Sequence, residues 1–377
     1  MATTPLHKPL LPGHYSLWFD PPDDSGDEVL HIVSERRTLK LKGKAFREFK
    51  NVVVPLLNGR HTVEEIQAAT SDLFRPDDLA DCLELLSAQG VLVEATGIEG
   101  HQAIAARMAP QLNFFHDLMP GADLQARLAK ATVAVVGLSG AGPAVALAIG
   151  AAGVGTLRCV DPLPVAPADI YLSPFLPLDR VGSPRPACIT HALGAAAPDT
   201  RAIGDHAALE SEADVHRAVA GADYVVCCLD PGQSNLIFKL NRVCLAENIR
   251  WISCAPAGAE VIVGPGVHPW HSACYLCYRM RAVACAGNPE DAYAYERQLD
   301  RRKQDDSGRR ENLVFGAGLA ANLLGLEVVK ELTGIAEPSL VGRLLTIRLT
   351  DLSIERHTVL RKPWCPACFP TAETTHA

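Results

Sequence analysis

Two pairs of cysteines constrain this chain more than any other feature of its sequence. Cys274 and Cys277 form one CxxC pair, and Cys365 and Cys368 form a second pair 91 residues further on. Four thiolates carried in two tight turns make a closed tetrahedral zinc site, which leaves no open position for catalysis. The spacing therefore predicts a structural zinc ion that ties the segment around residue 365 to the segment around residue 275.

Two other interpretations of these cysteines are weaker. The chain has 12 cysteines, so chance pairing is one alternative, although paired CxxC turns are rarely accidental. A redox-active CxxC is the other alternative. It is disfavoured because the sequence predicts that neither pair opens a helix directly after a strand.

Composition limits the classes of function that need to be considered. With 377 residues and 48% hydrophobic content, the chain can form two domains with real cores. A net charge of −8 and the lack of a long Lys/Arg run argue against a nucleic-acid partner. The cysteine content indicates a reducing compartment, and the first residues lack the pattern of a secretory signal, so we expect a cytoplasmic protein.

One uncharged stretch, residues 131–157, is long enough to span a membrane. Glycines interrupt it at the spacing of a strand, a turn and a helix. A buried parallel strand followed by a packed helix explains that pattern better, so we expect no membrane association.

Residues 12–96 have the pattern of a small winged-helix module. Three short strands are expected at 14–19, 28–34 and 37–43, followed by a helix over 45–59. A second helix begins at Thr62, with Glu65 completing a capping box, and a third runs from Pro76 to Gly90. That third helix carries acidic residues and no Lys or Arg, which argues against DNA binding.

The segments LLNGRHTVEEI and LLSAQGVLVE make this module resemble the PqqD-like recognition element of ribosomal-peptide biosynthesis. The resemblance implies that a leader peptide adds as a strand to the edge of the third strand and lies against the third helix. The edge would be Arg37, Thr38, Leu39, Lys40 and Leu41, and the helix would contribute Leu79, Cys82, Leu83 and Leu86. Alternatively, the leucines only fill the module's own core.

A helical connector is expected over 97–130, and a Rossmann-like domain over 131–370. The segment VAVVGLSGAG reads as a strand, a glycine turn with Gly137, Gly140 and Gly142, and a helix; TLRCVD is a second strand that ends on Asp161. Such glycines let the backbone approach a phosphate, and the acidic residue can accept hydrogen bonds from ribose. The strand YVVCCLD ends on Asp230, which suits a metal or phosphate contact or, alternatively, a helix N-cap.

Over residues 126–370 the chain resembles the ThiF/MoeB-like adenylating family. The resemblance rests on the segments just named, both CxxC pairs, and the helix GAGLAANLLGLEVVKELTG before a hairpin. Active members bind Mg-ATP through the glycine loop, two acidic residues, an arginine in an Asn-x-x-Arg-Gln segment and a lysine, and they form an acyl-adenylate. Here Gly137, Gly140, Gly142, Asp161 and Asp230 match those positions, and the fold class is α/β with a winged-helix module in front.

The cationic positions depart from that pattern. Leu172 or Ser173 in ADIYLSPF stands where the arginine is expected, and Arg185 replaces the lysine with a different hydrogen-bond geometry. Losing one charged phosphate contact costs roughly 3 kcal/mol of transition-state stabilisation, so adenylation is expected to be weak or absent. Cys285 is a candidate acyl-carrying thiol without a neighbouring histidine in the sequence, and a bystander thiol explains it equally well.

The two parts together resemble the ocin-ThiF-like partner proteins of azole- and azoline-forming peptide pathways. The resemblance implies a homodimer that binds the precursor's leader and presents its core to a separate YcaO-type cyclodehydratase, an effect of local concentration. The alternative is an enzyme of the microcin-adenylating type, which activates a peptide carboxylate with ATP. An NAD-dependent oxidoreductase would explain Gly137 to Asp161 only, and leaves the cysteine pairs without a role.

Overall fold

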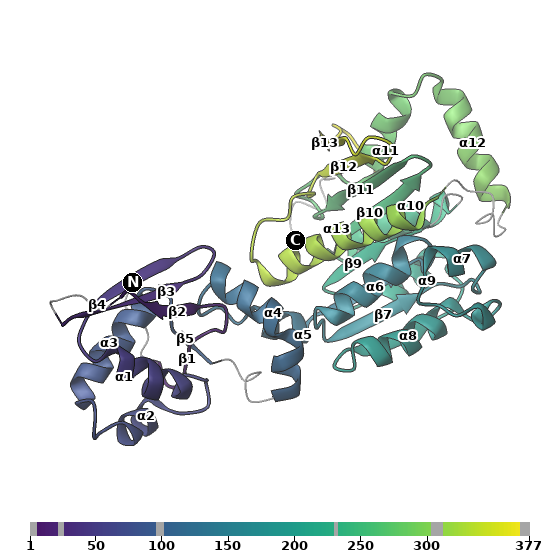
Figure 1. Cartoon of the computed structure of the whole chain (residues 1–377). Helices are drawn as coiled ribbons and strands as arrows, with labels where there is room; N and C mark the ends of the chain where they lie inside the picture. The colour runs from purple at the N-terminus through teal and green to yellow at the C-terminus, as the bar shows by residue number, and fades with distance from the viewer. Residues whose placement is uncertain (1–5, 22–25, 96–101, 230–232, 303–311, 370–377) are drawn as a thin grey trace. The chain divides into compact units, whose positions relative to one another are not determined.

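The computed structural model describes residues 6–21, 26–95, 102–229, 233–302 and 312–369. The chain divides into two compact units, residues 1–126 and 127–377 (Figure 1). Each unit has its own hydrophobic core.

The first unit contains a three-stranded antiparallel sheet. Its strands are β2 (Ser16–Phe19), β3 (Glu28–Val33) and β4 (Thr38–Gly43), in the order β2-β3-β4. The predicted strands are therefore confirmed. Because β3 lies in the middle, β4 has a sheet neighbour on one side only in the part of the chain that the structure describes.

Helices follow this sheet, as the sequence predicts, although the first one is irregular. The predicted helix over 45–59 is a series of short turns: α1 (Phe46–Glu48), a π-helical turn η1 (Phe49–Val53) and a 3₁₀ turn η2 (Val54–Leu56). Pro55 lies in the last of these and cannot donate an α-helical hydrogen bond.

The next two helices follow the prediction closely. Helix α2 (Val63–Ala69) has the predicted capping box, in which the Glu65 amide donates to Thr62 Oγ1 at 3.2 Å. Helix α3 (Pro76–Ala88) is followed by Gly90 at a positive φ of 67°. A two-stranded sheet of β1 (Pro9–Leu10) and β5 (Val93–Glu94) was not expected from the sequence. These elements agree with a small mixed module, and the winged-helix class itself stays a prediction.

Helix α4 (Gln102–Leu118) follows in the first unit, and α5 (Leu124–Lys130) leads into the second. In the second unit an eight-stranded sheet has the order β13-β12-β11-β10-β9-β6-β7-β8. The strands from β8 to β10 run parallel to one another, and β11, β12 and β13 extend the sheet in antiparallel fashion. The strands are β6 (Thr132–Val136), β7 (Thr156–Val160), β8 (Arg201–Asp205), β9 (Tyr224–Cys227), β10 (Arg250–Ala257), β11 (Glu260–Val267), β12 (Arg343–Arg348) and β13 (Ile354–Thr358).

Helices cover both faces of the parallel part. Helix α13 packs on α6 and α6 on α8, while α9 packs on α10 (Figure 1). The helices of this unit are α6 (Ala141–Ala151), α7 (Pro167–Leu172), the 3₁₀ turn η3 (Leu178–Arg180), α8 (Arg185–Ala196), α9 (Glu212–Val219), α10 (Ser234–Ala246), α11 (Tyr275–Ala284), α12 (Pro289–Arg302) and α13 (Val314–Thr333). This is the Rossmann-like α/β architecture that the glycine pattern predicts.

The uncharged stretch 131–157 forms β6, α6 and the start of β7, which confirms the strand–turn–helix interpretation. Both strands are central in the sheet, so their continuous apolar sequence is buried from two sides. Among the described residues, no helix is long and apolar enough to cross a membrane.

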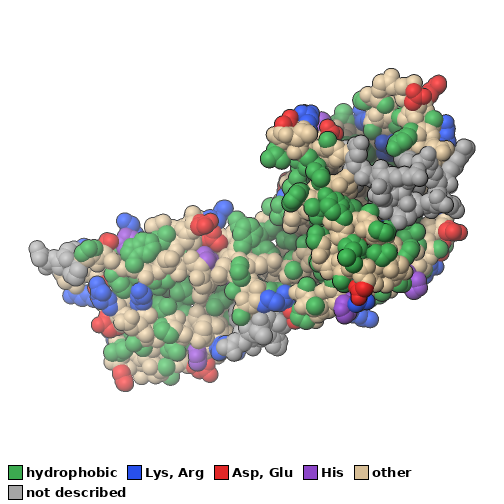
Figure 2. Space-filling model, turned by 45° about the vertical axis from the view of Figure 1, so that its right-hand side comes forward, with side chains coloured by type: hydrophobic (Ala, Val, Ile, Leu, Met, Phe, Trp, Pro, Cys, Tyr) green, Lys and Arg blue, Asp and Glu red, His purple; other side chains and the backbone are tan. Residues whose placement is uncertain are grey.

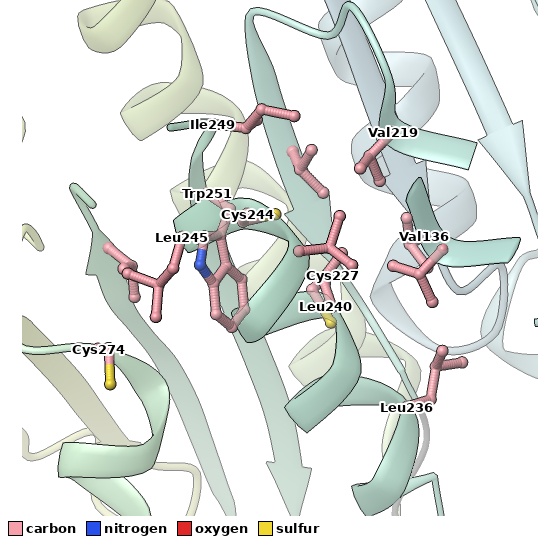
Figure 3. Packing of buried hydrophobic residues seen from close by; sticks show 14 of the residues in the cluster. Val136, Val219, Cys227, Leu236, Leu240, Cys244, Leu245, Ile249, Trp251 and Cys274 are labelled. Carbon is pink, nitrogen blue, oxygen red and sulfur yellow. The ribbon is translucent and has the colours of Figure 1, made fainter. Parts of the chain in front are cut away.

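A large apolar core lies between the sheet and α9 and α10. Trp251 on β10 is fully buried there and lies among side chains from β9, β10 and α10 (Figure 3). Cys274 lies at the edge of the same core, where α11 begins (Figure 3). The cysteine pairs are thus built onto the packed interior rather than onto a loose loop.

Candidate functional site

The four cysteines of the two CxxC pairs meet in one buried cluster. All their sulfur atoms lie within 4.8 Å of one another. The Sγ–Sγ distances are 3.9 Å for Cys274–Cys277, 3.8 Å for Cys274–Cys365 and 3.5 Å for Cys277–Cys368. A Zn–S bond of about 2.3 Å places tetrahedral sulfurs about 3.8 Å apart. The cluster therefore fits the size of a zinc ion, and the predicted convergence of the four residues is confirmed.

Local structure explains how each pair is held. Cys274 is the N-cap of α11, so Cys277 lies in the helix's first turn. This pair opens a helix, but α11 does not directly follow a strand, in agreement with the expectation that neither pair opens a helix directly after a strand. The Lys362 amide donates to Cys277 Sγ at 3.3 Å, and Arg361 donates to the carbonyls of Trp270 and Cys368. These contacts fix the second pair against the first.

Electrostatics also favour a cation in the cluster. The pKa of Cys277 is held far below its usual range by hydrogen bonds from Cys274 and Cys368, whereas the pKa of Cys274 is raised by its hydrogen bonds to Cys277 and Cys368. Thiols this close cannot all ionise unless a positive charge lies between them, and a thiolate-bound metal supplies that charge. These four residues could hold zinc in a structural role.

The glycine loop between β6 and α6 is shaped by close contact with the backbone of its surroundings. Gly137 has a φ of 93°, and a Cβ there would lie 2.6 Å from the Cys228 carbonyl oxygen. A Cβ on Gly142 would lie 2.1 Å from the Gly137 carbonyl oxygen. Gly140 is different: a Cβ there would meet no atom within 4 Å, so this position faces open space. Two of the three glycines are thus required by packing alone.

Asp161 lies directly beside this loop, at the end of β7. Its side chain is buried and accepts hydrogen bonds from the amides of Leu138 at 2.7 Å and Leu163 at 2.8 Å. Asp161 therefore orders the glycine loop by itself, whether or not a ribose is bound.

Arg185, the predicted phosphate-binding cation, lies between two carboxylates. Its Nη1 atom is 3.2 Å from Asp161 Oδ2, and its Nε atom is 2.8 Å from Asp169 Oδ2. The side chains of Arg185, Asp161 and Asp169 are 3%, 4% and 1% exposed. We call these three residues the carboxylate–guanidinium network. Its net charge is −1, so the charge of Arg185 is fully compensated inside the protein.

Asp169 is a residue that sequence reasoning missed. It lies in the first turn of α7, where its Oδ2 atom also accepts from the Ala166 amide at 2.8 Å. Its Oδ1 atom and the hydroxyl of Ser173 are buried without a hydrogen-bond partner. The sequence signal for Asp169 is the acid in the segment ADIYLSPF, close to the position where the arginine is expected.

The other predicted nucleotide residue, Asp230, lies outside the described residues. The strand expected to end on it is shorter than predicted and ends at Cys227. Leu172 is buried and Ser173 ends α7, and both side chains are uncharged, so neither can take the role of the family's arginine. Cys285 is exposed and is the C-cap of α11. No hydrogen bond or ion pair of its thiol with a described residue marks it as a nucleophile.

The predicted peptide-binding residues fall into two groups. Leu41, Leu79, Leu83 and Leu86 are buried in the core of the first unit. On β4, Thr38 and Lys40 are exposed and Leu39 is half-buried. Cys82 in α3 is half-buried as well, and Arg37, just before β4, donates to the Gly90 carbonyl at 2.8 Å. The strand edge thus offers exposed polar side chains, while the leucines of α3 serve the module's interior.

The fold and these two clusters define a class: a Rossmann-like α/β protein with a glycine loop and a four-cysteine cluster. The profile of the ThiF family matches residues 109–367, which is more than half of the chain. The chain belongs to the ThiF family.

Individual relatives agree with this assignment. Protein HesA of Nostoc is 30% identical over 262 residues, covering 68% of this chain and 92% of HesA. The sulfur carrier protein ThiS adenylyltransferase of Escherichia coli is 27% identical over 250 residues, covering 65% of this chain and 89% of that protein.

Solved structures extend the similarity of fold to both units. The structure of E. coli MccB with MccA-N7isoASN has a TM-score of 0.64 at 17% identity, and covers 96% of this chain and 99% of MccB. MccB with ATP has a TM-score of 0.62 at 17% identity, with the same coverage. At this level of identity the likeness concerns the fold.

Proposed function

We propose that this protein binds the leader of a precursor peptide and presents the peptide to a YcaO-type cyclodehydratase, in the biosynthesis of a thiazole- or oxazole-modified ribosomal peptide. The observation that carries the proposal is the position of Arg185. The cation that would contact phosphate is buried between two carboxylates. Since phosphoryl and adenylyl transfer depend on cations that neutralise developing charge, the pairing of Arg185 with two carboxylates favours binding over catalysis.

The edge of β4 supports the binding part of the proposal. Strand β4 pairs with β3 on one side, and its other side has no strand partner among the described residues. The backbone on that side can therefore pair with an added peptide strand. The exposed residues alternate along the strand, and they include Thr38, Lys40 and Lys42. Lys and Arg side chains are gathered at the left end of the first unit (Figure 2). We therefore propose a leader with acidic residues at alternate positions, which would lie opposite these lysines.

The remaining expectations belong to the same proposal. Zinc in the four-cysteine cluster would be structural, the ThiF-family domain would dimerise, and the protein would act in the cytoplasm. Nucleic acid is not a proposed partner, because the net charge of the chain is −8.

The second candidate is an ATP-dependent adenylyltransferase that activates a peptide or carrier-protein carboxylate. The matching glycine positions favour it, as does the similarity of fold to MccB with ATP and with MccA-N7isoASN. The sequence similarity to the ThiS adenylyltransferase of E. coli also favours this candidate.

One experiment separates the two candidates. The purified protein is incubated with Mg-ATP and its cognate precursor, while AMP and pyrophosphate release and leader binding by fluorescence polarisation are followed together. Leader binding without AMP supports the presenting role. Precursor-dependent AMP release contradicts it and supports the adenylyltransferase.

A matched pair of variants tests the binding surface. Lys40→Glu should weaken leader binding about tenfold or more, because it places like charges opposite an acidic peptide. Arg60→Glu makes the same charge change at an exposed residue of the same unit, outside β4, and should change binding less than about twofold. Equal losses in both variants would mean that general charge, and not the β4 edge, attracts the leader.

A further inference from the structure

The buried acid Asp169 gives the glycine-loop site a property that the missing arginine alone does not explain. Arg185 reaches toward the loop through Asp161, whose Oδ2 atom also accepts from the Leu138 amide. Asp169 binds the same guanidinium from the other side at 2.8 Å. Without Asp169, one carboxylate and one guanidinium would be left, with no net charge beside the loop. With it, the network carries an excess negative charge.

The excess charge lies where solvent does not screen it. Asp169 is 1% exposed, and its Oδ1 atom has no hydrogen-bond partner, as is also true of Ser173 Oγ. An unscreened charge in a buried site acts more strongly on a nearby ligand than a surface charge does. A polyphosphate at the glycine loop would therefore meet a local field that opposes it.

We infer that Asp169 is a specificity-determining residue. It lowers the affinity of the glycine-loop site for polyphosphate ligands, because it binds Arg185 and adds a buried negative charge. The inference rests on the proposed function, in which the ATP chemistry of the domain is lost. It names Asp169 as one cause of weak ATP binding, and a single substitution of Asp169 can remove that cause. Asp169→Asn keeps an oxygen that can accept from Arg185 and Ala166, and it removes the charge by replacing the other carboxylate oxygen with an NH2 group.

The test compares binding of Mg-ATP and of adenosine by isothermal titration calorimetry, with the full-length protein and with Asp169→Asn. We expect Asp169→Asn to bind Mg-ATP at least about tenfold more tightly than the unchanged protein, because one opposing charge in a poorly screened site is removed. Adenosine affinity should change less than about twofold. Asp179→Asn is the matched control, since Asp179 is an exposed acid in the same crossover segment, and it should leave both affinities unchanged.

Other outcomes overturn the inference. Equal Mg-ATP affinities of Asp169→Asn and the unchanged protein, including undetectable binding by both, would mean that Asp169 does not decide phosphate binding. An equal gain for adenosine would show that the substitution changes the shape of the site and not its charge. Asp169→Ser is a second neutral variant, in case the asparagine variant does not fold, as judged by circular dichroism.

This test can fail independently of the proposed function. Precursor-dependent AMP release by the unchanged protein would contradict the presenting role. The ratio of affinities between Asp169→Asn and the unchanged protein would still report on Asp169.

Discussion

The four-cysteine cluster and the carboxylate–guanidinium network are both buried groups of ionisable side chains in the second unit, but their charges are balanced differently. The cysteine cluster gathers four potential anions with sulfur atoms within 4.8 Å, and needs a cation from outside the chain. The network brings its own cation, Arg185, which lies between Asp161 and Asp169. A group that contains its own cation has less need of a cation from outside than a group of thiols alone.

The largest expected effect comes from breaking the cysteine cluster. Cys365→Ser should remove most bound zinc and lower the free energy of unfolding by about 5 kcal/mol or more, because metal binding in such sites is folding free energy. Zinc content by plasma mass spectrometry and urea unfolding would measure this. Cys285→Ser removes an exposed thiol from the same region and should alter neither quantity. Normal stability of the zinc-free variant would show that the cluster needs no cation from outside the chain.

The next largest effect should come from Arg185→Met. This change leaves two buried carboxylates without their cation, and the expected loss is about 3–5 kcal/mol in the free energy of unfolding. Arg180→Met is the matched control. Arg180 is 42% exposed, so its replacement should cost less than about 1 kcal/mol. Equal losses from the two changes would contradict the idea that Arg185 is the cation that stabilises the two buried carboxylates.

A smaller effect tests whether the glycine loop is shaped by packing. Gly142→Ala places a Cβ 2.1 Å from the Gly137 carbonyl oxygen and should cost about 2 kcal/mol. Gly194→Ala in α8 meets no atom within 4 Å and should be neutral or stabilising by up to about 1 kcal/mol. Thermal unfolding of both variants without any ligand would check this. If Gly142→Ala leaves the thermal stability unchanged, packing does not require the glycine, and ligand binding would be the remaining explanation for the loop.

Short-range patterns made much of this structure predictable. The Thr62–Glu65 capping box, the strands β2, β3, β4, β6 and β7, and the long helix α13 follow from spacing and apolar pattern over a few residues. The helix over 45–59 was predicted as regular, and the structure breaks it into three turns. Pro55 is the local cause, but its effect depends on how the segment packs against the sheet.

The candidate site was predictable only in part, for a physical reason. The sequence by itself determined the cysteine cluster, because CxxC turns fix two ligands each and leave only one pairing of the turns to be made. It also determined the glycine loop and the acid at the end of β7, since both are set by a strand, a turn and a helix in succession. Tertiary structure alone decided the fate of Arg185. Whether an arginine is free or captured depends on which carboxylates lie within about 3 Å of it. Asp169 comes within that distance because the backbone of residues 163–165 pairs with that of residues 182–185, which no spacing in the sequence predicts.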